Sequence, residues 1–190
     1  MPNIKIRQKN LKLARECLPL FQDVRRSAII HGVSDRPTDS TALAFALDRR
    51  VQFECSGGTV LWPVLMALPQ ERFDIPSSFD CDIRYSTTLT GASLFSRIDG
   101  LVDALNALPA YSSDSRGVYK NFAVRGALRL SYALDHEEDF RDVLVVAGDA
   151  VSDDAPAAFD PSIFDDLFPN GAVDADGTDA EGYADASELF

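Results

Sequence analysis

The stretch CDIRYSTTLTGASLFSRIDGLVDALNALP, residues 81–109, contains the two clearest secondary-structure patterns of the chain, one directly after the other. Its first ten residues are rich in β-branched side chains and alternate between two faces, which predicts a strand. In the remainder, apolar residues recur at helical spacing on one face, and Pro109 closes the run. These residues are Leu94, Ile98, Leu101, Leu105 and Leu108. A strand followed by a long helix predicts an α/β or α+β fold.

On both sides of this stretch, we expect helices and strands to alternate along the chain. Upstream, the pattern predicts a helix over residues 10–18, β-compatible runs at 40–47 and 50–55, and a short buried helix within 57–69. Pro63 is expected to kink that last helix because it has no backbone N–H. Downstream, the composition predicts a loop at 110–117, one or two strands over 118–134 and a short apolar strand at 142–148. We therefore predict a single compact domain with a mixed sheet and two to three helices, and we find no internal repeat.

Charge is unevenly distributed along the chain, whose 190 residues have a formal net charge of -12. Residues 151–190 contain eleven of the 30 acidic residues and no Lys or Arg, so residues 1–150 are almost neutral. Within that part, residues 1–26 contain seven bases and two acids. These numbers predict a globular body over 1–150 with a basic N-terminal segment, and a largely disordered acidic tail over 151–190.

The supply of metal ligands and cofactor motifs is small. Cys17, Cys55 and Cys81 form no CxxC pair, and His31 and His136 are the only histidines, which argues against a disulfide framework and a zinc site. The chain has no GxxxxGK[ST] loop and no GxGxxG after a predicted strand. Because no apolar run approaches the ~20 residues of a membrane-spanning helix, we expect a cytoplasmic protein with no membrane contact, no cofactor and no metal.

Cys55 is the first candidate catalytic residue. It lies in FECSGGTVLW, residues 53–62, directly before an expected helix, whose N-terminal N–H groups and dipole would stabilise a thiolate. The order FECSG at 53–57 resembles the nucleophile segment of NlpC/P60-type cysteine peptidases. That resemblance implies a cysteine hydrolase with Cys55 as nucleophile and His136, in the acidic segment ALDHEEDF, as its base. The alternative is a structural thiol.

A second pattern lies in the predicted strand IRYSTTLT, residues 83–90, together with EEDFRDVLVVAG, residues 137–148. It loosely resembles the strand pair of ADP-ribosyltransferases, with Arg84 and the hydroxyl residues 86–88 at the matching positions. The residues before VLVV, residues 143–146, are Phe-Arg-Asp, so the catalytic glutamate of that family has no counterpart. We interpret the hydroxyl residues as ordinary strand residues.

The acidic tail combines carboxylates with apolar anchors. Phe159, Ile163 and Leu167, and likewise Phe164 and Phe168, have helical spacing, which indicates a short amphipathic helix formed against a groove. The terminal segment DASELF resembles the acidic, Phe-terminated tails of single-stranded DNA-binding proteins from bacteria and phages. This resemblance implies recruitment of partner proteins and competition with DNA for a basic surface.

We therefore predict a non-catalytic protein whose C-terminal arm binds a partner protein through a basic or apolar groove. The residues expected to make this contact are Phe164, Asp165, Asp166, Phe168, Leu189 and Phe190. Nucleic acid is not expected to bind the tail directly, since both are polyanions. Two alternatives remain open: a tail that only increases solubility, and a tail that mimics nucleic acid on a basic surface.

Overall fold

The computed structural model of this chain describes residues 8–76, 84–112 and 117–146. It divides the chain into two units, residues 1–150 and 151–190, and all described residues belong to the first. The predicted acidic tail, the first seven residues and Cys81 lie outside the described residues. Within the described part, no helix is both long enough and apolar enough to cross a membrane.

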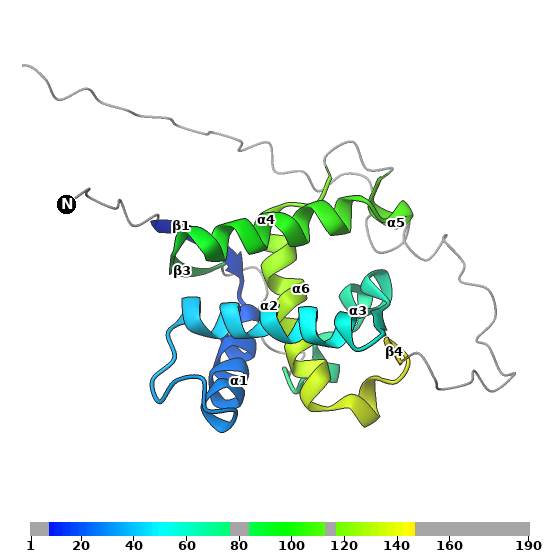
Figure 1. The fold of residues 1–190 in the computed structure, drawn as a ribbon, viewed down its shortest axis with the longest axis horizontal. Helices are drawn as coiled ribbons and strands as arrows, with labels where there is room; N and C mark the ends of the chain where they lie inside the picture. Colours follow the sequence, from blue (N-terminus) through cyan, green and yellow to red (C-terminus); the bar gives the residue numbers. More distant parts are fainter. Residues whose placement is uncertain (1–7, 77–83, 113–116, 147–190) are drawn as a thin grey trace, which may run out of the picture. The chain divides into compact units, whose positions relative to one another are not determined.

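The first unit combines four long helices with two small sheets (Figure 1). Its elements in chain order are β1 (Gln8–Ala14), α1 (Cys17–Ile30), α2 (Asp39–Cys55), β2 (Gly58–Val60), α3 (Trp62–Ala67), η1 (Gln70–Phe73), β3 (Arg84–Thr90), α4 (Ala92–Asn106), α5 (Pro109–Ser112), α6 (Lys120–Asp135), η2 (Glu137–Phe140) and β4 (Leu144–Val146). Strands β1 and β3 form one antiparallel pair, and β2 and β4 form another. The fold is therefore α+β. The predicted mixed sheet is wrong, because both pairings among the described strands are antiparallel.

The stretch that predicted the fold class behaves as expected. Residues 84–90 form β3, and residues 92–106 form α4 directly after it. The first four of the five apolar residues of the predicted face are at most 4% exposed, and Leu108 packs against the core. The short strand expected at 142–148 is also confirmed, as β4.

The helix predicted over residues 10–18 is wrong for residues 10–16. Leu11 and Leu13 are buried and alternate with exposed neighbours in β1, a period of two that belongs to a strand. Helix α1 begins only at Cys17. Pro19 lies in its first turn, where a missing N–H breaks no helical hydrogen bond.

The strands predicted at 40–47, 50–55 and 118–134 are also wrong, because these residues form helices α2 and α6. In α2, the side chain of Thr38 accepts a hydrogen bond from the N–H of Thr41, so the helix has an N-cap. Helix α6 packs against α1, α2, α3 and α4 and lies among them (Figure 1). Residues 126–134 are all buried, the polar Arg129 and Ser131 included, because the helix is covered on several sides.

The predicted buried helix within 57–69 divides into β2 and α3. Pro63 lies in the first turn of α3, where proline is tolerated, so it starts the helix and does not kink it. The N–H of Leu61 donates to the carbonyl of Val143 at 2.9 Å, which continues the β2–β4 pairing. This small sheet connects β2, which lies between α2 and β3 in the chain, with β4 near the end of the body.

The order of the long elements contains a repeat that we did not find in the sequence. Strand β1 is followed by α1 and α2, and strand β3 is followed by α4 and α6. The first unit of this repeat spans residues 8–55 and the second spans residues 84–135. We refer to them as the first and second βαα units.

Candidate functional site

The β1–β3 pair is a two-stranded antiparallel ribbon in which all seven residues of each strand are paired. One face packs on the helices, where Leu11, Leu13, Thr87 and Leu89 are each at most 6% exposed. Side chains alternate across a strand, so the residues between them lie on the opposite face. This opposite face is called the outer face of the ribbon.

The outer face presents hydrogen-bonding side chains and positive charge. Its exposed residues are Gln8, Asn10 and Lys12 from β1 and Arg84, Ser86, Thr88 and Thr90 from β3. Neither strand contains an acidic residue. Across the ribbon, the hydroxyl of Thr88 donates to Oδ1 of Asn10 at 2.7 Å. The ribbon therefore exposes donors, acceptors and cations on one narrow surface.

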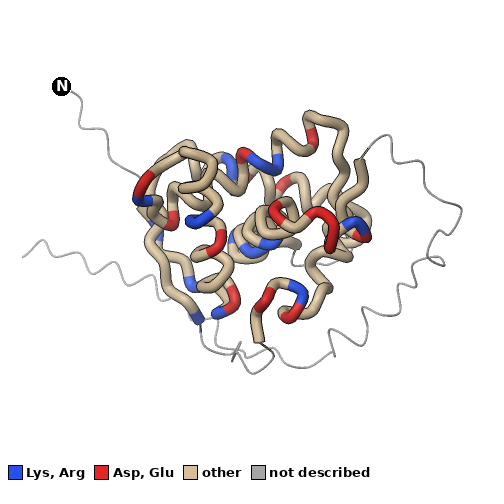
Figure 2. The backbone as a smooth tube through the Cα atoms, turned by 90° about the horizontal axis from the view of Figure 1, so that it is seen from below, with Lys and Arg blue, Asp and Glu red and all other residues tan. Residues whose placement is uncertain are grey.

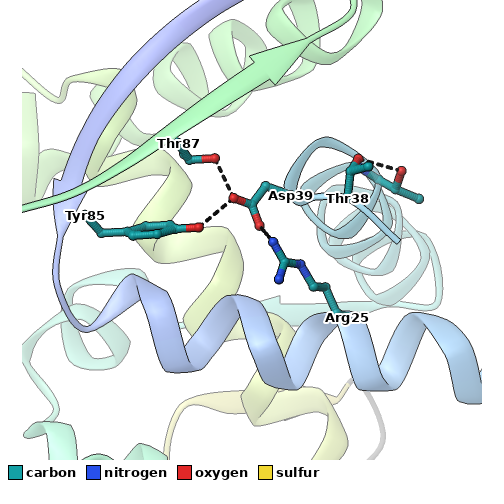
Figure 3. A network of polar contacts seen from close by, with 6 residues as sticks. Arg25, Thr38, Asp39, Tyr85 and Thr87 are labelled. Carbon is teal, nitrogen blue, oxygen red and sulfur yellow. Dashed lines mark hydrogen bonds and ion pairs between the residues drawn. The ribbon is translucent and has the colours of Figure 1, made fainter. Parts of the chain in front are cut away.

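Asp39, the first residue of α2, fixes the inner side of the ribbon to the helices (Figure 3). Its carboxylate accepts hydrogen bonds from the hydroxyls of Tyr85 and Thr87 and pairs with the guanidinium of Arg25. Burial and the hydrogen bond to Asp39 raise the pKa of Tyr85, so its hydroxyl remains a neutral donor. These contacts join α1, α2 and β3 and hold the ribbon in one orientation.

Two further bonds hold the edges of the ribbon. The N–H of Thr90 donates to the hydroxyl of Ser40 on α2 at 2.9 Å. Nδ2 of Asn121 on α6 donates to the carbonyl of Lys12 at 2.9 Å. Each strand is thus attached to the second helix of the opposite βαα unit.

Over the helices, charges of opposite sign lie close to each other (Figure 2). Among the described residues, nine ion pairs join bases to acids within the body. Neither Lys12 nor Arg84 belongs to an ion pair with a described residue. The positive charge of the outer face is therefore not compensated by the described body.

The most deeply buried charge is a structural one. Arg129 on α6 is 1% exposed, and one of its terminal nitrogens donates to the carbonyls of Leu65, Met66 and Leu68 at 2.9–3.0 Å. The other donates to Glu16 Oε2 at 2.9 Å. Burial lowers the pKa of Arg129, although these partners favour its charged form. The arginine satisfies carbonyls at the end of α3 and ties this helix to the start of α1.

Cys55 lies at the end of α2, and His136 lines a cavity whose lining residues do not include Cys55. Cys55 is the exposed last residue of α2, so the helix N-terminus expected behind it is wrong, and the negative end of the dipole lies there instead. Arg49, six residues earlier on α2, pairs with Asp135 next to His136. At a rise of ~1.5 Å per residue, Cys55 lies about 9 Å beyond Arg49 along the axis of α2.

The other thiol that the structure describes is Cys17, which is completely buried. Burial and the neighbouring Glu16 raise its pKa to about 12. It is therefore a neutral core side chain at the start of α1.

His136 lines a cavity of about 330 Å³ between the ends of α1 and α6. Its ring stacks on Tyr132 with the ring centroids 4.2 Å apart, and Nδ1 lies 3.0 Å from the carbonyl of Tyr132. His31 lines the same cavity, so the two histidines of the chain meet there although 104 residues separate them in the sequence. Asp23 and Asp135 face them. Among the described residues, no cluster of three or more His, Cys, Asp or Glu has a geometry that could hold a metal ion.

Sequence reasoning missed the ribbon as a site. Its cations, Lys12 and Arg84, lie 72 residues apart and become neighbours only through the β1–β3 pairing. A usable signal was present in KNLKL, residues 9–13, which alternates polar and apolar residues as a half-buried strand does. The predicted contact residues of the arm, which are Phe164, Asp165, Asp166, Phe168, Leu189 and Phe190, lie outside the described residues.

We compared the chain with models of protein families, with curated proteins and with solved structures, and nothing matches it.

Proposed function

We propose that this protein binds double-stranded DNA by placing the outer face of the β1–β3 ribbon in the major groove. The observation that supports the proposal is this face itself, which is exposed, two strands wide and free of acidic residues. Paired strands lie ~4.8 Å apart, and the major groove of B-form DNA, about 12 Å wide, admits a two-stranded ribbon. The deep, narrow major groove of A-form RNA does not.

The outer-face side chains have the chemistry that recognises base edges. Arg84 and Lys12 can donate to O6 and N7 of guanine, and Asn10 can pair with N6 and N7 of adenine. Hydroxyls such as that of Ser86 can bond to several bases. Each well-placed bidentate contact discriminates against a wrong base by ~1–3 kcal/mol.

The negative charge of the whole chain is compatible with this proposal. The eleven acids of residues 151–190 supply almost all of the net charge of -12, while the ribbon strands contain three bases, Lys9, Lys12 and Arg84. Each phosphate contact made by a basic residue adds about -0.9 to the slope of log affinity against log salt concentration. The affinity is therefore expected to fall as salt rises.

The proposal is tested by fluorescence anisotropy of a labelled duplex of mixed sequence, titrated with the full chain. Arg84→Gln is expected to weaken binding by about fivefold or more, because it removes a base or phosphate contact. The matched control is Arg141→Gln, which removes the same charge from an exposed residue after η2 and is expected to leave binding within twofold. Equal effects of the two variants would show attraction by charge alone.

We further propose that residues 151–190 form an arm that engages a partner protein. Their eleven acids occur without a single base and alternate with aromatic and aliphatic residues. Such a segment supplies steering charges together with apolar anchors. The anchors we propose are Phe164, Phe168, Leu189 and Phe190, with Asp165 and Asp166 as steering charges.

Affinity capture with the full chain and with a chain ending at Ala150 tests the arm. The partner should be retained by the full chain only, and retention should fall between 50 and 300 mM salt if the acids steer association. Phe164→Ala with Phe168→Ala keeps every charge and isolates the contribution of the anchors. Retention of the same partner by the shortened chain would place its binding site on the body.

A further inference from the structure

The first helices of the two βαα units share four buried positions. These buried residues of α1 and α4 follow one another at the same sequence intervals in both helices. The matching pairs are Cys17 with Leu94, Phe21 with Ile98, Val24 with Leu101, and Ala28 with Leu105. Helix α1 therefore has the same core-facing stripe as α4.

The second helices correspond more closely still. The run Ala-Leu-x-x-Ala-Leu of α2 matches Ala-Val-x-x-Ala-Leu of α6, and these residues are buried in both helices. The matching pairs are Ala42 with Ala123, Leu43 with Val124, Ala46 with Ala127, and Leu47 with Leu128. Thr38 and Tyr119 occupy the equivalent N-cap positions.

Contacts between elements follow the same correspondence. Helix α1 packs on α2 as α4 packs on α6, and α1 packs on α6 as α4 packs on α2. Helix α2 contacts β3, and α6 contacts β1. Helices α2 and α6 pack on each other, as do the two strands. Each contact has its counterpart, which is the arrangement of two copies related by a two-fold axis.

The register of the ribbon locates this axis. Leu11 pairs with Thr87 at the middle of the seven pairs, and the two are equivalent to each other. On the outer face, the same rotation exchanges Lys12 with Thr88, Asn10 with Ser86, and Gln8 with Arg84. The backbone of the ribbon is thus nearly symmetric, while none of these outer-face pairs is identical.

The differences gather the positive charge at one end of the outer face. Lys12 pairs with Ser86, and Arg84 is the next outer-face position on the same side of the axis, opposite Ala14. Such diagonal neighbours lie ~7–8 Å apart, about two base steps of 3.4 Å. On the other side of the axis, the outer-face pairs are Asn10 with Thr88 and Gln8 with Thr90. One half is cationic, and the other half carries only amides and hydroxyls.

We infer that one copy of this chain recognises a non-palindromic stretch of duplex DNA, with guanine under the cationic half of the ribbon and adenine under the amide half. This inference rests on the proposed function and specifies the DNA that the ribbon takes. Identical protomers related by a two-fold axis present identical halves and therefore bind palindromic sites. Here a single chain supplies both strands, and its halves differ.

Selection of bound sequences from a duplex library with a randomised core tests the inference, using the full chain. Native mass spectrometry of the selected complex gives the number of chains per duplex. The expected result is one chain on the shortest bound duplex and a consensus whose two halves differ, with guanine in one half and adenine in the other. A palindromic consensus bound by two chains would overturn the inference.

A charge-neutral exchange sharpens the test. Lys12→Thr combined with Thr88→Lys moves one cation across the axis, between two exposed and equivalent positions, and keeps the total charge. Guanine is then expected in both halves, and affinity for the original site should fall by about 5- to 150-fold, the equivalent of one lost base contact. An unchanged consensus would overturn the inference.

Different results would refute the proposed DNA binding and the inferred recognition of a particular sequence. If the full chain binds no duplex in the anisotropy titration, the proposed function itself fails. If it binds duplexes of every sequence with the same affinity, DNA binding stands and the recognition of a particular sequence is refuted. Thermal unfolding of the exchange variant serves as the folding control, because the Thr88 to Asn10 hydrogen bond is altered by it.

Discussion

Helices α2 and α6 occupy equivalent places in the two βαα units, yet their surroundings differ. Helix α2 buries five of its residues, and α6 buries eleven. The additional cover of α6 comes from α3, η1 and η2, which pack on it and belong to neither copy of the repeat. The comparison shows that the segments added around the repeat, and not the repeat itself, decide which helix becomes the central core element.

The largest difference in the effect of substitution on the free energy of unfolding is expected between Arg129 of α6 and its equivalent on α2, Asp48. Arg129→Leu removes four hydrogen bonds and leaves three carbonyls at the end of α3, two of them in the helix and one directly after it, without this partner. We expect the free energy of unfolding to fall by about 3–5 kcal/mol. Asp48 pairs with Arg97 on the surface and is 60% exposed, so Asp48→Ala should cost at most about 1 kcal/mol.

Chemical denaturation of the full chain measures both values. A cost for Arg129→Leu as small as that for Asp48→Ala would mean that the end of α3 is satisfied without the arginine. The comparison between a core helix and a half-exposed helix would then lose its energetic basis.

Substituting the first residue of α2 or α6 is expected to have an effect of intermediate size on the free energy of unfolding. Asp39 of α2 pairs with Arg25 of α1, and Lys120 of α6 pairs with Asp99 of α4, with the signs of charge reversed. Asp39 also accepts two hydroxyl hydrogen bonds from β3 and is 11% exposed. We expect Asp39→Ala to lower the free energy of unfolding by about 2–3 kcal/mol.

Lys120→Ala removes a more exposed pair and should cost at most about 1 kcal/mol. Denaturation curves of the two variants, recorded under the same conditions, test this ranking. Equal costs would show that the hydroxyls of the ribbon contribute little to the stability of the first βαα unit.

The smallest effects are expected at two glycines within helices. Gly126 of α6 takes the place of Phe45 of α2, and a Cβ there would lie 3.2 Å from the ring of Trp62. Gly126→Val should therefore destabilise the protein by about 1–2 kcal/mol through overpacking. Gly100 of α4 has open space around it, so Gly100→Ala should stabilise by about 1 kcal/mol through helix propensity.

Melting temperatures of the two glycine variants should move in opposite directions. Stabilisation by Gly126→Val would show that α3 does not pack closely on α6. That result would also weaken the explanation given above for the burial of α6.

The elements that sequence reasoning identified are those whose signal is local. Helix α4 has its buried apolar residues at helical spacing and a proline shortly after it, and β3 is rich in threonine and alternates exposed with less exposed side chains. Helices α2 and α6 were mistaken for strands because their apolar runs lack a clear period of 3.6. In α6 the reason is physical: a helix covered on several sides has apolar residues around most of its circumference.

The candidate site could not be predicted from the sequence, for a related reason. Each ribbon strand alone is a short polar segment with two buried side chains, and nothing local identifies its partner strand. The sequence drew attention to Cys55 because a small-residue turn follows it. The structure places that cysteine at the end of α2 and brings Lys12 and Arg84 onto one surface.

Composition and local periodicity were sufficient to predict a fold that mixes helices and strands, the central strand-helix stretch and the separation of charge between residues 1–150 and 151–190, whereas the antiparallel α+β arrangement came from the structure. Only the tertiary structure decided the pairing of β1 with β3, the two-fold relation of the βαα units and the choice of α6 as the core helix. The strand pairing depends on contacts between residues 70 or more positions apart, and side-chain patterns with a period of two or 3.6 contain no information about which distant segment will meet them.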